Sequence, residues 1–324
     1  MQELHIGEND AGQRFDKYLK KLLAEAPGSF VYKMLRKKNI TLNSKKADGT
    51  EKLSCGDEVK LFLSDETYEK FRAKSKTVMP EAFSGSEKTL RQLKVLYEDA
   101  DILIINKPSG MLSQKARPED VSANEYILSY LLREGALTEE EMRTFRPSVC
   151  NRLDRNTSGI LIAGKTLKGL QEMSKALKER TIQKYYRCVV KGEVLREDYL
   201  KGWLVKDERE NKVTVSTVKP KSADAAPIET EYHIIKQEED VTLLEVHLIT
   251  GRSHQIRAHL ASIGHPIIGD VKYGDAGTNE QFRRQCKVKS QMLHAYRIVF
   301  ADGREVIAPC GAEFARVEEW CKNR

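Results

Sequence analysis

The sequence predicts an α+β fold, with a mostly antiparallel mixed sheet behind a small N-terminal α/β domain. Alternating strand-like segments outnumber helical ones after residue 90 and cluster late in the chain, which does not suit a doubly wound parallel sheet. Residues 1–63 instead begin with two helical stripes that lead into strands. The 324 residues suffice for two domains, which we place at 1–63 and 90–324. Residues 64–89 are charged and small without apolar periodicity, so we expect a linker there.

The first domain contains the whole excess of positive charge. The chain has 55 Lys and Arg against 48 Asp and Glu, a formal charge of +7. Residues 12–46 hold ten Lys and Arg but only Asp16 and Glu25 as acids, which makes this stretch +8 and the rest −1. A localised basic stretch is typical of a protein that binds a polyanion. The alternative is a solvated lysine-rich surface without a partner.

Two short helices and two strands account for this domain. Apolar residues from Phe15 to Leu23 follow helical spacing, and a second stripe runs from Val31 to Leu35 after the break at Pro27. Residues 40–43 and 58–62 alternate as strands do. The basic residues outside the second stripe are Lys33, Arg36, Lys37 and Lys38.

The larger domain is a series of alternating segments with few helices between them. The predicted strands are 102–105, 160–163, 184–190, 213–218, 230–235, 241–249 and 294–300. The predicted helices are 125–133, 167–179, 253–263 and 313–321.

Composition excludes several classes of protein. No apolar run approaches the length of a membrane span, and the first ten residues lack the basic-then-apolar pattern of a secretory signal. The six cysteines are scattered without a C-x-x-C pair, which predicts neither a disulfide framework nor a zinc ribbon. We therefore expect a cytoplasmic protein with no membrane association.

The first dense polar segment is 151–159, which runs from a loop into an apolar strand. Asp154 lies between Arg152 and Arg155, and nearby positive charge favours the ionised carboxylate. A carboxylate can act as a nucleophile or a base without a cofactor. Alternatively, Asp154 caps the loop and the arginines are surface charges.

The second polar segment is 251–260, which follows a strand and opens a predicted helix. Ser253 is a candidate N-cap, which would leave Arg252 close to a helix N-terminus suited to an anion. His254 and His259 do not share a helix face, so we expect structural hydrogen bonds from them and no zinc site.

The third segment is the predicted strand 184–190. Strand alternation places Tyr186 on the face opposite Tyr185. Tyr186 is either a core aromatic residue or a surface on which a base stacks.

In this order, the segments resemble a known enzyme family. The chain contains "R-L-D-R-N-T-S-G", then "K-x-Y-x-C-V-V", then "G-R-S-H-Q-I-R-x-H-L-A-S-I-G-H-P-I-I-G-D", and earlier "N-K-P-S-G". Residues from about 90 to 324 resemble the RluA-type pseudouridine synthases, and residues 1–63 resemble an S4-type RNA-binding domain. Together they resemble the subgroup that acts on large-subunit ribosomal RNA.

The resemblance implies a role for several residues. Asp154 would be the catalytic aspartate, Arg257 its arginine partner, Tyr186 the active-site tyrosine, and Arg152 would help to handle the displaced nucleotide. The family motif usually begins with His where this chain has Asn151, which we expect to change local packing or substrate contacts without loss of activity. The other residues that we expect to contact RNA are Arg14, Lys33, Arg36, Lys37, Lys38, Asn106, Lys107, Arg252 and His254.

The expected activity is the isomerisation of uridine to pseudouridine in large-subunit (23S) ribosomal RNA by a monomer that uses no cofactor and no metal. Asp154 would start the reaction on a flipped-out nucleotide, either by covalent attack or by abstracting a ribose proton. Two alternatives remain at this point. A glycoside hydrolase would need a second carboxylate, and a non-catalytic RNA-binding or ribosome-assembly module would need only the basic stretch.

Overall fold

The computed structural model describes residues 1–72, 93–238 and 240–322 and contains two separate sheets. The first sheet is four-stranded and antiparallel, with the order β1-β4-β2-β3. Helices α1 and α2 bury their apolar stripes against it, so that Phe15, Leu19 and Leu35 are almost fully enclosed. The elements of this part are β1 (Gln2–His5), α1 (Phe15–Leu22), α2 (Gly28–Arg36), β2 (Ile40–Leu42), β3 (Lys45–Lys46), β4 (Glu58–Leu61) and α3 (Asp65–Phe71).

The second sheet has 11 strands in the described residues, with the main order β11-β10-β12-β13-β9-β14-β8-β6-β5. Every ladder is antiparallel except the one between β8 and β14, so the predicted α+β class with a mostly antiparallel sheet is confirmed. The strands are β5 (Lys94–Glu98), β6 (Ile102–Lys107), β7 (Ser148–Val149), β8 (Ser158–Gly164), β9 (Gln183–Lys191), β10 (Asp198–Asp207), β11 (Lys212–Ser216), β12 (Ala226–Glu238), β13 (Val241–Leu248), β14 (Leu293–Val299) and β15 (Glu305–Ile307). The helices are α5 (Ala123–Arg133), α6 (Glu141–Thr144), α7 (Leu167–Glu179), α8 (Gln255–Ser262), α9 (Ala276–Gln285) and α10 (Ala312–Lys322).

The parallel contact between β8 and β14 depends on a glycine. Gly159 has a φ of +109°, and a Cβ atom there would lie 2.2 Å from the carbonyl oxygen of Ala295. A residue with a side chain would therefore separate the two strands. This close approach places the start of β8, and the loop before it, beside β14.

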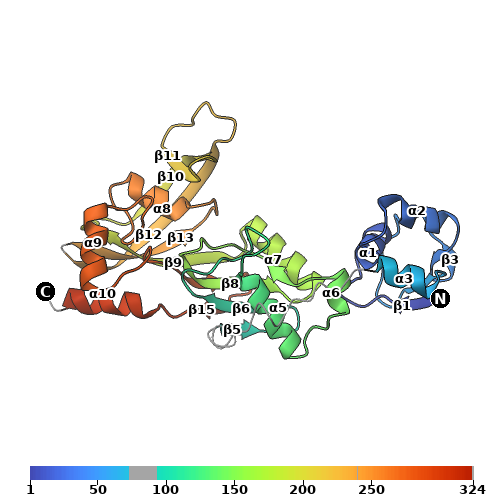
Figure 1. The fold of residues 1–324 in the computed structure, drawn as a ribbon. Coiled ribbons are helices and arrows are strands. Elements are labelled where there is room, and N and C mark those ends of the chain that lie inside the picture. The colour runs from blue at the N-terminus through green and yellow to red at the C-terminus, as the bar shows by residue number, and fades with distance from the viewer. Residues whose placement is uncertain (73–92, 239, 323–324) are drawn as a thin grey trace.

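The N-terminal part rests on the larger part through α6, as Figure 1 shows. Thr144 Oγ1 donates to Asp10 Oδ2 at 3.0 Å, and the backbone N–H of Leu167 donates to Asn9 Oδ1 at 3.4 Å. Burial at this contact raises the pKa of Asp10. Of the expected linker, residues 65–71 form α3, whose Tyr68 is buried in the N-terminal core, while 73–92 lie outside the described residues.

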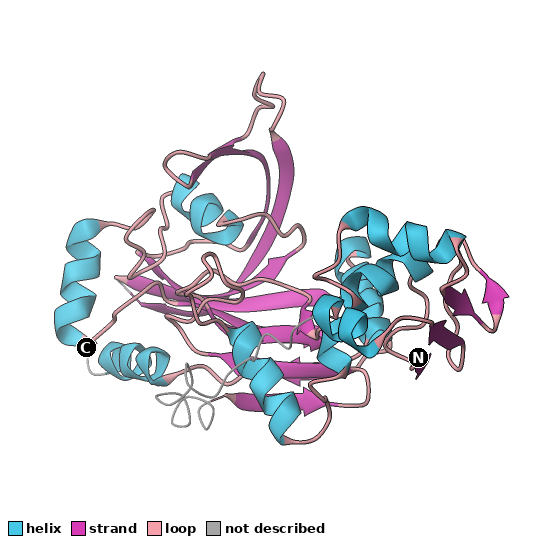
Figure 2. Ribbon diagram, turned by 45° about the vertical axis from the view of Figure 1, so that its right-hand side comes forward, coloured by secondary structure: helices cyan, strands magenta, loops and turns pink. Residues whose placement is uncertain are grey.

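Two features of the sheet and its helices position the functional site. Figure 2 shows the strands of the larger part as one continuous curved layer, with β10 and β11 bending away from it. Helix α8 packs on β11 and β12. It begins at Gln255, after His254 in the left-handed region (φ 54°), so the prediction that Ser253 caps this helix was wrong.

None of the helices in the described ranges combines the length and the apolar character that a bilayer crossing requires.

Candidate active site

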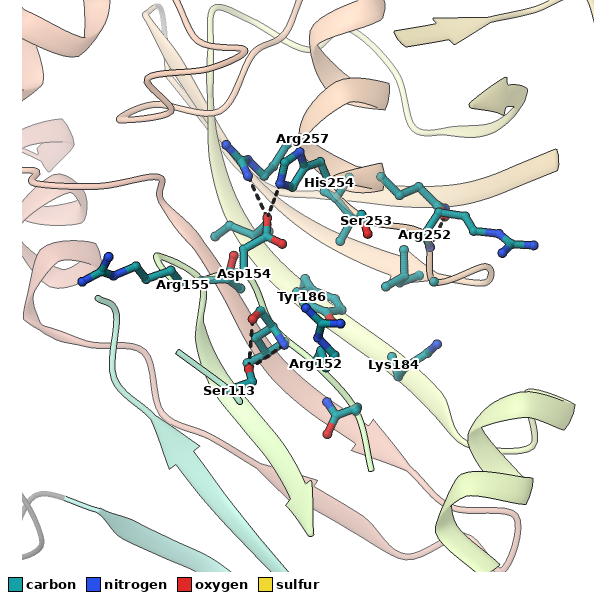
Figure 3. A pocket seen from close by; sticks show the side chains of 18 of the residues that line it. Ser113, Arg152, Asp154, Arg155, Lys184, Tyr186, Arg252, Ser253, His254 and Arg257 are labelled. Carbon is teal, nitrogen blue, oxygen red and sulfur yellow. Dashed lines mark hydrogen bonds and ion pairs between the residues drawn. The ribbon is translucent and has the colours of Figure 1, made fainter. Parts of the chain in front are cut away.

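A pocket of about 1180 Å³ lies over the middle of the large sheet. Its walls come from the loop before β8, from β9, from the loop before α8 and from the end of α7 (Figure 3). Of the described residues that line it, nine are Lys or Arg and one, Asp154, is acidic. The pocket therefore suits a polyanion and offers it a single carboxylate.

Asp154 and Arg257 meet in this pocket. Arg257 Nη1 donates to Asp154 Oδ2 at 2.7 Å, and His254 Nε2 lies 3.9 Å from the same oxygen. The Arg257 side chain is 7% exposed and that of Asp154 is 28% exposed. A buried cation thus holds a carboxylate that solvent and ligands can still reach.

Asp270 occupies the other side of Arg257, and our sequence analysis assigned it no role. Arg257 donates from Nε to Asp270 Oδ2 at 2.7 Å and from Nη2 to Asp270 Oδ1 at 2.9 Å. Burial opposes ionisation of Asp270, but the bonds and charge of Arg257 hold its pKa below the ordinary value. The motif "G-H-P-I-I-G-D" contained the residue, but nothing in that motif indicated its partner.

Tyr186 on β9 is buried beside Asp154. Burial raises the pKa of its phenol, and the negative charge of Asp154 raises it further. The hydroxyl therefore stays protonated at neutral pH. Tyr186 belongs to the hydrophobic core and also lines the pocket, and its stacking on a base stays a prediction.

Ser113 clamps the loop that carries Asp154. Its hydroxyl donates to the Leu153 carbonyl at 2.9 Å and accepts the Leu153 N–H at 3.0 Å. On the other side, Asn151 donates to the Ile160 carbonyl at 3.2 Å and accepts the Ile162 N–H at 2.8 Å. Asn151 thus ties the loop to β8 and also lines the pocket, and its effect on packing or substrate contacts stays a prediction.

Lys107 is a correction to the set of RNA-contacting residues. It is 0% exposed, and its Nζ donates to the carbonyls of Pro108, Met111 and Arg155 at 3.0, 2.8 and 3.2 Å. Burial lowers its pKa to about 7. Because all three bonds go to backbone, Lys107 supports the Asp154 loop and presents no surface to RNA.

Asn106 on β6 is partly exposed, and its contact with RNA stays a prediction. It lies outside the residues that line the pocket, and its amide donates to the Pro309 carbonyl at 3.2 Å. The segment around "N-K-P-S-G" is therefore a support beneath the site.

The remaining predicted RNA-contacting residues fall into two groups. Arg152, Arg252 and His254 line the pocket with Asp154. The other group is exposed on the N-terminal part and comprises Arg14, which pairs with Asp16 at 3.1 Å, and Lys33, Arg36, Lys37 and Lys38. Their contacts with RNA stay a prediction.

The structure adds cations that our sequence analysis missed. Lys184 lies on the same face of β9 as Tyr186, and burial together with the charge of Arg180 lowers its pKa. Alternation along the strand could have identified Lys184, but the others come from separate elements. The pocket-lining cations missed in this way are Lys178, Arg180, Lys184, Lys206 and Lys272.

The described residues contain no group of three or more His, Cys, Asp or Glu side chains arranged for a metal ion. His259, for which we predicted a structural role, is buried with Nδ1 3.0 Å from Thr230 Oγ1.

Comparison with known proteins decides the family. Residues 101–262, half of the chain, match the sequence model of RNA pseudouridylate synthase. The chain belongs to the RNA pseudouridylate synthase family. Its relatives include proteins named ribosomal large subunit pseudouridine synthase C. That of Vibrio vulnificus is 31% identical across 98% of this chain and 95% of the relative, and that of Pasteurella multocida is 33% identical across 92% and 85%.

The fold of a solved pseudouridylate synthase agrees with this membership. Human RNA pseudouridylate synthase domain containing 4 superposes with a TM-score of 0.59 at 19% identity, over 71% of this chain and 95% of that one. The family match spans both Asp154 and Arg257, so the matched region includes the two residues that meet at 2.7 Å.

Proposed function

We propose that this protein isomerises uridine to pseudouridine in large-subunit ribosomal RNA, with Asp154 as the residue that starts the reaction. The observation that carries the proposal is the pocket itself, where one reachable carboxylate lies among nine Lys and Arg residues and beside the ring of Tyr186. The names of the relatives indicate which RNA is the substrate, because both are ribosomal large subunit pseudouridine synthases. We also propose that the enzyme works in the cytoplasm, where it would meet ribosomal RNA, and that it is a monomer.

The reaction breaks the bond from N1 of uracil to C1′ and joins C5 to C1′, with no net oxidation or reduction. Asp154 would act by one of two routes, covalent attack or removal of a ribose proton. Both routes need a carboxylate with an accessible oxygen, and Arg257 Nη1 holds only Oδ2 of Asp154, at 2.7 Å.

The uridine must leave its stack to reach Asp154. We propose that Arg152 and Arg252, exposed at the pocket, stabilise the flipped nucleotide and its neighbouring phosphates. Lys184 and Arg180 extend this cationic wall toward the end of α7. Residues 1–63 would bind RNA at a distance from the reaction, as an S4-like domain separate from the catalytic domain at 90–324.

The two alternatives find no support in the site. A glycoside hydrolase needs two carboxylates that face the substrate, but Asp270 is 0% exposed and bound to Arg257. A non-catalytic binding module has no use for a reachable carboxylate held by a buried arginine.

The test is chemical mapping of pseudouridine in total ribosomal RNA from cells with and without the gene. We expect at least one uridine of the large subunit to lose its modification in the deleted strain. Reintroducing the wild-type gene should restore it. An identical map in the two strains would overturn the proposed substrate.

Asp154→Ala tests the role of the carboxylate. We expect pseudouridine formation to fall by more than about 1,000-fold, because the group that starts the reaction is gone. The dissociation constant for RNA should stay within about threefold of wild type, since the cations around the pocket remain. Measurable turnover at the wild-type rate would refute the assignment of Asp154.

A further inference from the structure

Asp270 determines which edge of Arg257 faces Asp154. The Nε and Nη2 atoms of Arg257 bind the two oxygens of Asp270, at 2.7 and 2.9 Å. This edge of a guanidinium matches a carboxylate with two parallel hydrogen bonds. With that edge occupied, Asp154 meets Nη1 and receives one hydrogen bond, through Oδ2 at 2.7 Å.

Asp270 is the fixed member of this trio. Its side chain is fully buried, and Oδ1 also accepts the N–H groups of Lys272 at 2.9 Å and Tyr273 at 3.1 Å. Its backbone carbonyl accepts from the Asn279 amide and from the Gly274 N–H, both at 2.9 Å. Besides Arg257, two N–H groups of its own loop thus hold the carboxylate, and Asn279 on α9 anchors the backbone of Asp270.

The backbone before Asp270 has no freedom to shift it. Gly269 has a φ of +79°, and a Cβ atom there would lie 2.3 Å from the Ser290 carbonyl oxygen. The Gly269 N–H donates to Asn279 Oδ1 at 2.7 Å. Asp270 is therefore a rigid support against which Arg257 is held.

The way in which Asp270 holds Arg257 affects the hydrogen bonds that Asp154 receives. Its Oδ1 accepts no hydrogen bond from the part of the chain that the structure describes, and Figure 3 shows both contacts of the carboxylate on the other oxygen. A guanidinium free to rotate would present two donors to Asp154 and engage both oxygens. Each additional donor stabilises the resting carboxylate and makes it a weaker nucleophile or base.

We propose that Asp270 is a positioning residue for catalysis: it holds the Nε edge of Arg257, limits Arg257 to one hydrogen bond with Asp154, and leaves the second Asp154 oxygen free to react with the bound uridine. This inference rests on the proposed function. It applies whether that oxygen attacks carbon or removes a proton.

Asp270→Asn is the direct test, because the amide has the same size and its oxygen can still accept the Lys272 and Tyr273 N–H groups. The substrate is an unmodified transcript of 23S ribosomal RNA. We expect the single-turnover rate constant at saturating enzyme to fall about 10- to 100-fold, with the dissociation constant for the transcript within about threefold of wild type. A rate within twofold of wild type, or a rate that falls in parallel with the affinity, would overturn the proposal.

The matched control is Asp275→Asn, five residues along the chain. Asp275 is 41% exposed, caps α9 through the Thr278 N–H at 2.8 Å and pairs with Lys191. We expect this variant to lose some stability and to keep the wild-type rate. An equal loss of rate in both variants would show that the loop is merely structural.

A double-mutant cycle separates action through Arg257 from other effects. Lysine lacks the guanidinium edge that binds both oxygens of Asp270. In an Arg257→Lys background, Asp270→Asn should therefore lower the rate by less than about threefold. If the two substitutions lowered the rate independently, so that their fold-losses multiplied in the double variant, the proposal would be contradicted. If Asp270→Asn fails to fold, Asn279→Ala, which removes the amide that anchors Asp270, should lower the rate several-fold at unchanged affinity; an unchanged rate counts against the proposal.

Wild-type activity on the same transcript distinguishes failure of the proposed function from failure of the proposed role of Asp270. An inactive wild-type protein would contradict the proposed function. An active wild type beside an equally active Asp270→Asn variant would contradict only the role of Asp270.

Discussion

Tyr186 illustrates how one residue's environment selects among its possible roles. As the active-site tyrosine that the resemblance implies, it could stack on the uracil or act as a base. Its burial and the neighbouring Asp154 both raise the pKa of the phenol, so a tyrosinate base is scarce at neutral pH. The stacking role is therefore the one that the environment favours.

Substitutions at Tyr186 distinguish stacking from proton transfer. Tyr186→Phe keeps the ring, so we expect a loss of rate below about tenfold. Tyr186→Ala removes a stacking surface worth about 1–3 kcal/mol per base, and its rate should fall by about 10- to 100-fold more than that of the Phe variant. Both are measured as single-turnover rates on the same RNA. Equal losses in the two variants would show that the hydroxyl takes part in the chemistry.

Lys107 and Asn106 both make contacts that their motif did not predict. Charge and motif both favoured contact with RNA, yet both side chains donate to backbone carbonyls. A lysine is recognisable in a sequence, but one of the three carbonyls that surround this one belongs to Arg155, 48 positions further along the chain.

At the scale of elements, α8 is the helix that delivers Arg257 to the site. It carries Arg257 on one side and is tied to β12 by His259, whose ring meets Thr230 at 3.0 Å. Burial lowers the pKa of His259 to about 4 from an ordinary value of 6.5. Docking of α8 on β12 therefore requires a neutral histidine.

The stability of the protein should decrease as the pH falls from about 6.5 to about 4. In that range the unfolded chain binds a proton at His259 that the folded chain excludes. The contribution of His259 to the free energy of unfolding is therefore complete above pH 6.5 and is lost as the pH falls. The difference in pKa corresponds to about 3 kcal/mol. Denaturant unfolding of wild type and His259→Gln at several pH values measures it, and the variant should show a shallower decline.

His265→Gln is the control for this experiment, because His265 is a partly buried histidine close to the same helix, with Nδ1 3.1 Å from the Lys191 carbonyl oxygen. It should keep the wild-type dependence on pH. Carboxylates that titrate in the same range affect all three proteins alike, so only the difference between them is informative. A wild-type slope in His259→Gln would show that the docking of α8 does not depend on this proton.

At the scale of the whole molecule, the pocket and the exposed side of α2 are two places where positive charge gathers among the described residues. The basic residues of α2 and its end belong to the N-terminal part, which Figure 1 shows at one end of the molecule, with α9 at the other. We therefore expect the N-terminal part to supply affinity for RNA and the pocket to carry out the reaction.

Neutralising the N-terminal site should weaken binding without slowing the reaction. We expect the triple change Arg36→Gln, Lys37→Gln and Lys38→Gln to raise the dissociation constant for RNA. The slope of log affinity against log salt should fall by about 2 to 3, if all three residues contact phosphates. The single-turnover rate at saturating enzyme should be unchanged. Filter binding over a range of salt concentrations measures the first effect.

The matched control neutralises three cations at the opposite end, Arg284, Lys287 and Lys289, which are all exposed. Lys287 also shares the positive φ of Lys38, 57° against 58°. Equal effects of both triple changes on the salt slope would mean that the N-terminal site has no special part in binding RNA.

Local patterns predicted most of the elements and missed those whose sequence is weakly periodic. The helix expected at 167–179 has those bounds, and each expected strand lies on an observed one with ends that differ by a few residues. The elements that were not predicted are β1, β3, β5, β7, β10 and β15 among the strands and α3, α6 and α9 among the helices. Helix α9 is mostly polar and contributes Phe282 as its buried residue, so its position depends on neighbours such as Trp320 rather than on a stripe of its own.

The sequence by itself determined the fold class, the basic N-terminal stretch and the polar segments around Asp154, Tyr186 and Arg257, because periodicity, charge and motif order are local properties of a chain. Only the tertiary structure decided that Lys107 supports the loop, that Asp270 holds Arg257, and that Asp154 keeps one oxygen free. Those outcomes depend on burial and on hydrogen bonds between residues as far apart as Asp154 and Arg257, which are 103 positions from each other. Such pairs form only when β8, β9 and α8 come together around one pocket, and no short stretch of sequence contains that information.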